Sequence, residues 1–70
     1  GPELALALVD RLDLLALGGY HAYHATRADL LRRVGRSGEA RAAYDQAIEL
    51  ARNMAEVAYL TRRRDQLGPA

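Results

Sequence analysis

The sequence predicts an all-α protein of about four antiparallel helices, and three observations lead to this prediction. Ala and Leu dominate the hydrophobic residues, which make up 50% of the chain, while Phe and Trp are absent and four Tyr are the only aromatic residues. This composition is typical of thin, closely packed helices and not of a thick β core. Leucines also recur at helical spacing, and glycines or capping residues separate the segments that carry them.

The first helix is expected from about Pro2 to Leu17, because proline is tolerated in the first helical turn, where its missing N–H has no partner to lose. Gly18 and Gly19 would end this helix. Four leucines recur at helical spacing and form one apolar stripe: Leu4, Leu8, Leu12 and Leu15.

Leu6 and Leu17 lie on the side of this helix that also carries Asp10 and Asp13. A helix with leucines on more than one face usually has neighbours on more than one side. We therefore expect Leu6 and Leu17 to contact a preceding repeat of the same protein or a second copy of the chain. On this expectation the 70 residues are a fragment of a longer solenoid-like domain.

The second helix is expected from about Tyr20 to Val34, with Gly35 as its stop. Ser37 suits the N-cap of a third helix over about residues 38–52, and Glu39 suits its first turn. The connections contain only a few residues, so successive helices should lie antiparallel.

A fourth helix is predicted over residues 54–67. Asn53 and Glu56 have the N-x-x-E spacing of a capping box, in which each side chain bonds the backbone near the other. Gly68 and Pro69 would end the helix, since neither continues helical hydrogen bonding well.

Composition and charge exclude several classes of protein. The chain has no Cys, so it can form neither a disulfide framework nor a thiolate metal site. All ten basic residues are Arg, but the net charge is only +1, which is too small for a dedicated nucleic-acid binder. The sequence shows no apolar run of the roughly 20 residues that a membrane span needs, and no secretory signal, so a cytoplasmic location is expected.

The stretch VGRSGEARAAYDQAIEL places the small residues Ala40 and Ala47 on either side of Tyr44. This spacing resembles the second helix of a tetratricopeptide (TPR) repeat, whose signature includes A-x3-F. The resemblance implies one degenerate repeat over residues 20–53, the second helix of a preceding repeat over residues 1–18, and a capping helix over residues 54–67. The first half of the repeat departs from the pattern, which favours Trp, Leu, Gly and Tyr at the positions of His24, Arg27, Ala28 and Leu31.

A second resemblance covers nearly the whole chain. The run GYHAYHATRADLLRRVGRSGEARAAYDQAIELARN, followed by YLTRRR, is similar to the C-terminal TPR-like extension of a group of bacterial sigma factors of the extracytoplasmic-function (ECF) type. Val57 is a departure, since such tails often carry a charged residue there. The resemblance implies a regulatory extension of a transcription initiation factor. Its partners would be the remaining domains of the same sigma factor or RNA polymerase.

The first helices of a TPR stack line its groove. The resemblance therefore implies that five residues of the second helix face a partner: Ala22, Ala25, Asp29, Arg32 and Arg33. Asp29 and Arg33 are also four apart, so an ordinary ion pair on the helix surface is an equal alternative for these two residues.

Catalytic and metal-binding chemistry is not expected. His21 and His24 share a helix face, but a transition-metal site needs further ligands, and Ala25 and Ala28 stand one turn on. We expect both histidines to be structural, one of them in the large inward position. Ser37 is better explained as a cap than as a nucleophile, so we predict no enzyme activity, no cofactor and no metal.

Two arginine clusters leave a nucleic-acid contact as an alternative. Arg62–Arg64 form a basic run, and a looser cluster consists of Arg32, Arg33 and Arg36. Contacts of either cluster with phosphates would make binding strongly salt-dependent. The other alternative is a generic TPR adaptor that forms a homodimer through the first helix.

Overall fold

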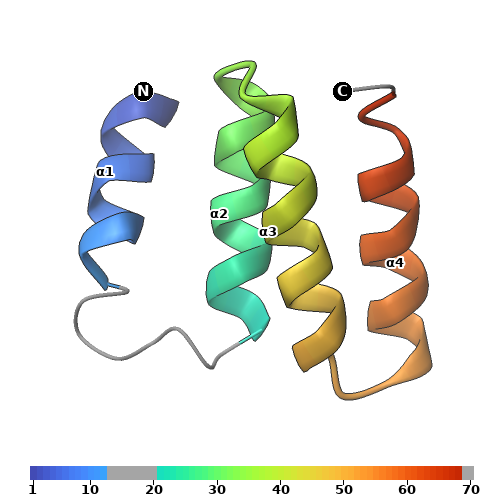
Figure 1. Cartoon of the computed structure of the whole chain (residues 1–70). Coiled ribbons are helices and arrows are strands. Elements are labelled where there is room, and N and C mark those ends of the chain that lie inside the picture. Colours follow the sequence, from blue (N-terminus) through green and yellow to red (C-terminus); the bar gives the residue numbers. More distant parts are fainter. Residues whose placement is uncertain (13–20, 69–70) are drawn as a thin grey trace.

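The protein is all-helical over the described part of the chain, residues 1–12 and 21–68 of the computed structural model, where no strand occurs. Its helices are α1 (Pro2–Leu12), α2 (His21–Arg33), α3 (Ser37–Leu50) and α4 (Met54–Asp65). They stand side by side in chain order, and each runs antiparallel to the one before it (Figure 1). None of these helices is long and apolar enough to cross a membrane.

α1 contacts α2 through a face that the leucine spacing did not predict. Leu6 is only 4% exposed, and Ala5 and Val9 pack beside it, whereas Leu4 is 66% and Leu8 is 54% exposed. Residues two apart on a helix lie about 200° apart around its axis, so burying Leu6 turns both other leucines outward. The apolar stripe is therefore exposed at Leu4 and Leu8, while Leu15 and the side chain of Leu12 lie outside the described residues.

The same geometry corrects the predicted external contact of Leu6, because this side chain already lies in the hydrophobic core of the chain. An ion pair supports the observed orientation of α1, since Asp10 accepts a hydrogen bond from Arg27 of α2 at 2.6 Å. Leu17 and the predicted stop at Gly18 and Gly19 lie outside the described residues.

The turn between α2 and α3 is a Schellman motif. Gly35 has φ +83°, the left-handed region that glycine enters without steric cost. Its N–H donates to the Arg32 carbonyl at 3.1 Å, and the Arg36 N–H donates to the Leu31 carbonyl at 2.9 Å. These two bonds satisfy carbonyls at the end of α2, so the predicted stop at Gly35 is confirmed.

α3 begins one residue earlier than predicted, and Ser37 is not its N-cap. The N-cap position belongs to Arg36, which makes no side-chain cap bond, and Ser37 is the first helical residue. The Arg36 guanidinium instead binds both carboxylate oxygens of Glu39, at 2.6 and 2.9 Å. The Schellman turn reaches Arg36 and brings the chain into the helix there, which leaves the Ser37 hydroxyl one position too late to cap.

The start of α4 follows the predicted capping box. The Asn53 side chain accepts a hydrogen bond from the Glu56 N–H at 2.8 Å, and the Glu56 carboxylate accepts one from the Arg52 N–H at 3.1 Å. The Glu56 carboxylate thus bonds the N–H of Arg52, one residue before Asn53, and not the N–H of Asn53 itself. α4 ends at Asp65, two residues before the predicted end, and Gly68 follows with φ +74°.

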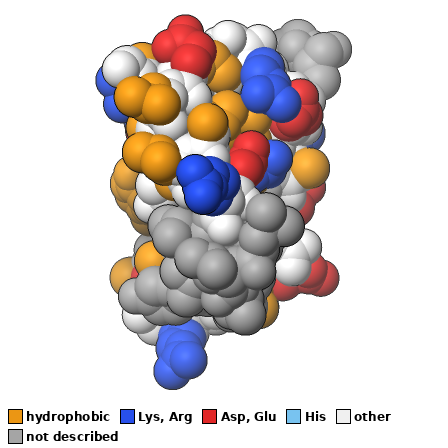
Figure 2. Space-filling view, turned by 90° about the vertical axis from the view of Figure 1, so that its left-hand side faces the viewer, with side chains coloured by type: hydrophobic (Ala, Val, Ile, Leu, Met, Phe, Trp, Pro, Cys, Tyr) orange, Lys and Arg blue, Asp and Glu red, His pale blue; other side chains and the backbone are white. Residues whose placement is uncertain are grey.

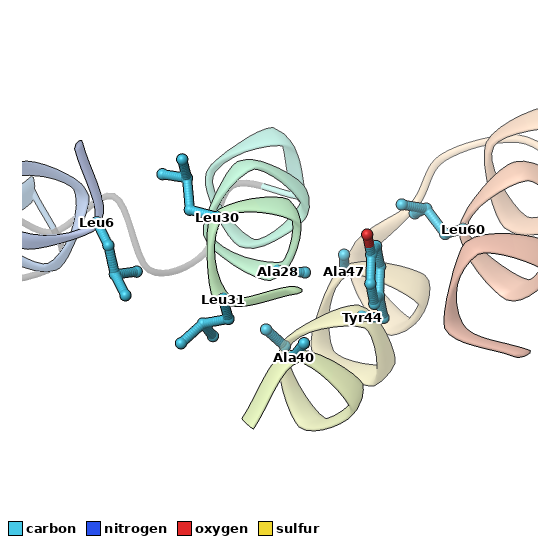
Figure 3. Packing of buried hydrophobic residues seen from close by; sticks show 9 residues of the cluster. Leu6, Ala28, Leu30, Leu31, Ala40, Tyr44, Ala47 and Leu60 are labelled. Carbon is cyan, nitrogen blue, oxygen red and sulfur yellow. The ribbon is translucent and has the colours of Figure 1, made fainter. Parts of the chain in front are cut away.

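The core runs through all described helices and is built largely from small residues. Ala40 and Ala47 of α3 are completely buried on either side of Tyr44, as their spacing predicts. Leu60 of α4 points toward the Tyr44 ring (Figure 3). Most of the remaining core comes from α1, α2 and α3, namely Leu6, Ala28, Leu30, Leu31 and Ala43. The alanines let α2 and α3 approach closely, so these two helices form the main packed pair.

Candidate functional site

A groove runs between α2 and α4. One hollow of about 400 Å³ is lined by Ala25, Thr26, Asp29, Leu30, Arg33, Tyr44, Tyr59 and Leu60. A second hollow, of about 240 Å³, is lined by Ala22, Ala25, Thr26, Glu56, Tyr59 and Leu60. Four residues line both hollows, so the two form one trough. α4 packs mainly on α3, and Tyr44 of α3 therefore contributes to the floor.

The floor of the groove is apolar because small side chains of α2 face larger ones of α4. Ala22 and Ala25 are three apart and share one face of α2. Tyr59 and Leu60 approach from α4; Leu60 is buried in the core, whereas Tyr59 is 56% exposed. An exposed aromatic ring beside an alanine-lined trough is typical of a surface that receives another side chain.

The structure places four of the five predicted partner-facing residues along this groove: Ala22, Ala25, Asp29 and Arg33. Arg32 is not among the lining residues. Its Nη2 donates to Asp29 at 2.7 Å, and its Nε is buried without a hydrogen-bond partner. The α4 side of the groove was not predicted, although Glu56, Tyr59 and Leu60 have the i, i+3, i+4 spacing of one helix face.

Asp29 is bound by two arginines at one end of the groove. Arg32 donates to its Oδ1 at 2.7 Å, and Arg63 of α4 donates to the same oxygen at 3.3 Å. The Arg32 guanidinium, followed by Arg63, holds the pKa of the Asp29 carboxyl below its ordinary value, and partial burial offsets only part of this effect. The alternative of an Asp29–Arg33 surface pair is wrong, since Asp29 takes Arg32, three residues away, and Arg63 instead.

Arg33 contributes a free positive charge to the same end of the groove. Its side chain is exposed and lines the larger hollow. Within residues 1–12 and 21–68, Asp29 pairs with Arg32 and Arg63, and the Arg33 side chain forms no ion pair or hydrogen bond. In the part of the chain that the structure describes, this end therefore carries three guanidiniums and one carboxylate, a surplus of positive charge.

Of the two histidines, the structure describes the side chain of His24, which lies against Tyr23. Tyr23 is a buried aromatic residue near the start of α2, and the His21 side chain lies outside the described residues. The Tyr23 ring lies edge-on to the ring of the half-buried His24, with 4.9 Å between the centroids. Among the described residues, His, Asp and Glu form no group of three that could hold a metal ion.

Most arginines of the two clusters form ion pairs with carboxylates. In the basic run, Arg63 binds Asp29, and Arg64 binds Asp45 at 2.7 Å and Asp65 at 3.3 Å. In the looser cluster, Arg32 and Arg36 are paired as described above. Guanidiniums that already hold carboxylates are less available to phosphates.

Comparisons with known proteins identify one relative and no family. The chain is 49% identical over 67 residues to the uncharacterized protein R00370 of Rhizobium meliloti (strain 1021). The match covers 96% of the chain but spans only 16% of the length of that protein. No protein-family profile matches the chain, and no solved structure matches it. A similar unit thus occurs within a much longer bacterial protein.

Proposed function

We propose that the chain is a helical protein-interaction module that serves as the C-terminal regulatory extension of an ECF-type sigma factor. The observation that best supports an interaction role is the groove between α2 and α4, with its apolar floor and its charged end. The support for the sigma-factor context is the resemblance of residues 19–53 and of the YLTRRR run. In this proposal α2 and α3 form one TPR-like repeat, α1 is the second helix of a preceding repeat, and α4 is the capping helix.

The proposed mechanism is regulation through packing. The module docks on the core domains of the sigma factor or on RNA polymerase, and this contact sets whether the promoter-binding domains are available. The segment itself performs no catalysis and directs no transcription alone. A small, rigid helical stack suits this role because its groove is formed before the partner arrives.

The test uses the Rhizobium meliloti protein, whose matching segment can be deleted from the whole. We expect deletion of the 67 matching residues to change transcription from a cognate promoter reporter, with the shortened protein still accumulating normally. Loss of transcription would assign an activating role to the segment, and a rise would assign a restraining role. Unchanged transcription would refute the proposal.

A homodimer through α1 is a second candidate, and the exposed Leu4 and Leu8 favour it. Hydrophobic side chains gather in the upper half of the face seen from the α1 side (Figure 2). Sedimentation at several concentrations would show a dimer, and Leu4→Glu together with Leu8→Glu would then abolish it. A concentration-independent monomer would eliminate this candidate.

A further inference from the structure

We infer that the groove between α2 and α4 receives an acidic peptide segment, with a carboxylate at Arg33 and an aliphatic side chain against Tyr59 and Leu60. This inference rests on the proposed interaction role and specifies the chemistry of the partner. It does not depend on the sigma-factor context. Its basis is the combination of a charge surplus at one end of the groove with an apolar floor along the rest.

The charged end accounts for the acidic group. Asp29 already accepts hydrogen bonds from Arg32 and Arg63, so its charge is compensated within the chain. Arg33 lies in the same hollow, is exposed, and has no carboxylate partner among the described residues. A carboxylate from outside would complete the pairing, because guanidinium groups bind carboxylates through charge-assisted, often bidentate hydrogen bonds.

The apolar floor accounts for the aliphatic side chain of the peptide. The distance along the groove sets the spacing between this side chain and the carboxylate. Ala25 and Arg33 are eight residues apart on α2, which corresponds to about 12 Å along the helix axis. An extended peptide covers that distance in about four residues. The expected partner segment therefore carries Asp or Glu about four residues from Leu, Ile or Val.

The opposite end of the groove indicates where the acidic residue of the peptide lies. Glu56 lines the smaller hollow, where it also accepts the Arg52 N–H. A second acidic residue of the ligand would meet like charge there, so the acidic end of the peptide belongs at Arg33.

A protein segment fits this groove better than a nucleic acid. Glu56 lines the smaller hollow and would repel a phosphate backbone that continued along the trough from Arg33. Among the described lining residues, Tyr59 is the one exposed aromatic ring, whereas single-stranded nucleic acids usually require several stacking platforms. Most guanidiniums near the groove already hold carboxylates, as Arg32 and Arg63 do.

The experiment selects phage-displayed random peptides of about 12 residues on the immobilised 70-residue chain. We expect enrichment of peptides with Asp or Glu about four residues from an aliphatic residue. The Arg33→Glu variant should bind a synthetic selected peptide about tenfold more weakly and should itself select peptides with Lys or Arg at that position. Tyr59→Ala should weaken the preference for the aliphatic residue while leaving the preference for the acidic one.

Arg11→Glu is the matched control, because Arg11 is an exposed arginine of α1 outside the groove. It should select the same peptides as the unaltered chain, and circular dichroism of each variant checks that the helices are intact. Selection without acidic enrichment, or the same peptides from Arg33→Glu, would overturn the inference. Displacement of the selected peptide by duplex DNA at physiological salt would overturn it in favour of a phosphate ligand.

The two proposals can fail separately. Acidic peptides selected by the chain, together with unchanged reporter transcription after deletion, would leave the groove chemistry standing and remove the sigma-factor function. Altered transcription without acidic enrichment would leave the regulatory function standing and remove the assigned peptide chemistry.

Discussion

Arg63 of α4 donates a hydrogen bond to Asp29 of α2 at 3.3 Å, although 34 positions separate the two residues in the chain. α4 packs mainly on α3, so this ion pair is a direct link between the two walls of the groove. Asp29 also binds Arg32 of its own helix, which holds the carboxylate in place for Arg63. The charged end of the groove thus depends on contacts from both α2 and α4.

Asp29→Asn should lower the free energy of unfolding by up to about 1 kcal/mol near pH 7, because it removes a partly exposed ion-pair network. The folded-state pKa of Asp29 lies below its ordinary value of 3.8. The stabilisation is therefore fully present above about pH 4 to 5 and is lost as the pH falls through the lowered pKa. Urea unfolding of the two proteins should give a difference near pH 7 that shrinks toward about pH 2.

Asp65→Asn is the control for this prediction, because Asp65 pairs at 3.3 Å with Arg64, which Asp45 binds more closely, at 2.7 Å. We expect this change to stay within about 0.5 kcal/mol of the unaltered chain. A constant difference for Asp29→Asn across the whole pH range would show that the charge of Asp29 is not responsible.

Leu31→Ala should unfold the protein or destabilise it by about 2–5 kcal/mol, because Leu31 is completely buried between the helices and its truncation leaves a cavity. Leu4→Ala makes the same chemical change at an exposed position and should change the stability by less than about 0.5 kcal/mol. Thermal unfolding followed by circular dichroism compares the two. Equal losses would contradict the observed orientation of α1.

Gly35→Ala should cost about 1 kcal/mol, because a Cβ at φ +83° is strained even though nothing lies within 4 Å of it. Gly38 offers a matched control, since it lies within α3 and a Cβ there also meets nothing within 4 Å. Gly38→Ala should therefore stabilise the chain by up to about 1 kcal/mol. Chemical denaturation of both variants would show opposite signs, and the same sign for both would refute the assigned backbone conformations.

Asn53→Ala should lower the stability by about 1 kcal/mol, because it removes the side-chain acceptor for the Glu56 N–H. Asn53→Asp should retain most of the stability, since aspartate also caps helices well. Ser37→Ala should be nearly neutral, because Ser37 lies inside α3 and does not cap it. Melting temperatures of the three variants test this order, and a larger loss at Ser37 than at Asn53 would contradict it.

Much of the local structure could be predicted because its causes lie within a few residues. The stop at Gly35 depends on one left-handed residue and two short-range hydrogen bonds, and the start of α4 depends on Asn53 and Glu56. Ala40, Tyr44 and Ala47 could also be assigned to one buried face, because α3 has a single apolar side at that spacing. The error at Ser37 has a local cause as well. The Schellman turn that ends α2 includes Arg36, so α3 begins directly after Arg36 and Ser37 is already helical.

The α2 side of the groove could be predicted in part from the resemblance to a TPR repeat, which implied that Ala22, Ala25, Asp29 and Arg33 face a partner. The α4 side could not, because the backbone after α3 decides which face of α4 turns toward α2. Arg63 therefore reaches Asp29 through a contact that no local spacing encodes.

The sequence by itself determined the all-α class, the positions of the turns at Gly35 and Asn53, and the buried face of α3, since hydrogen bonds within four or five residues and one periodic apolar stripe specify them. Only the tertiary structure decided that Leu6 faces α2 while Leu4 and Leu8 face outward, and that Asp29 binds Arg32 and Arg63 and not Arg33. α1 carries leucines on two faces, and Asp29 has several arginines within reach. The choice among equivalent local options depends on where a neighbouring helix lies, and that position depends on residues far away in the chain.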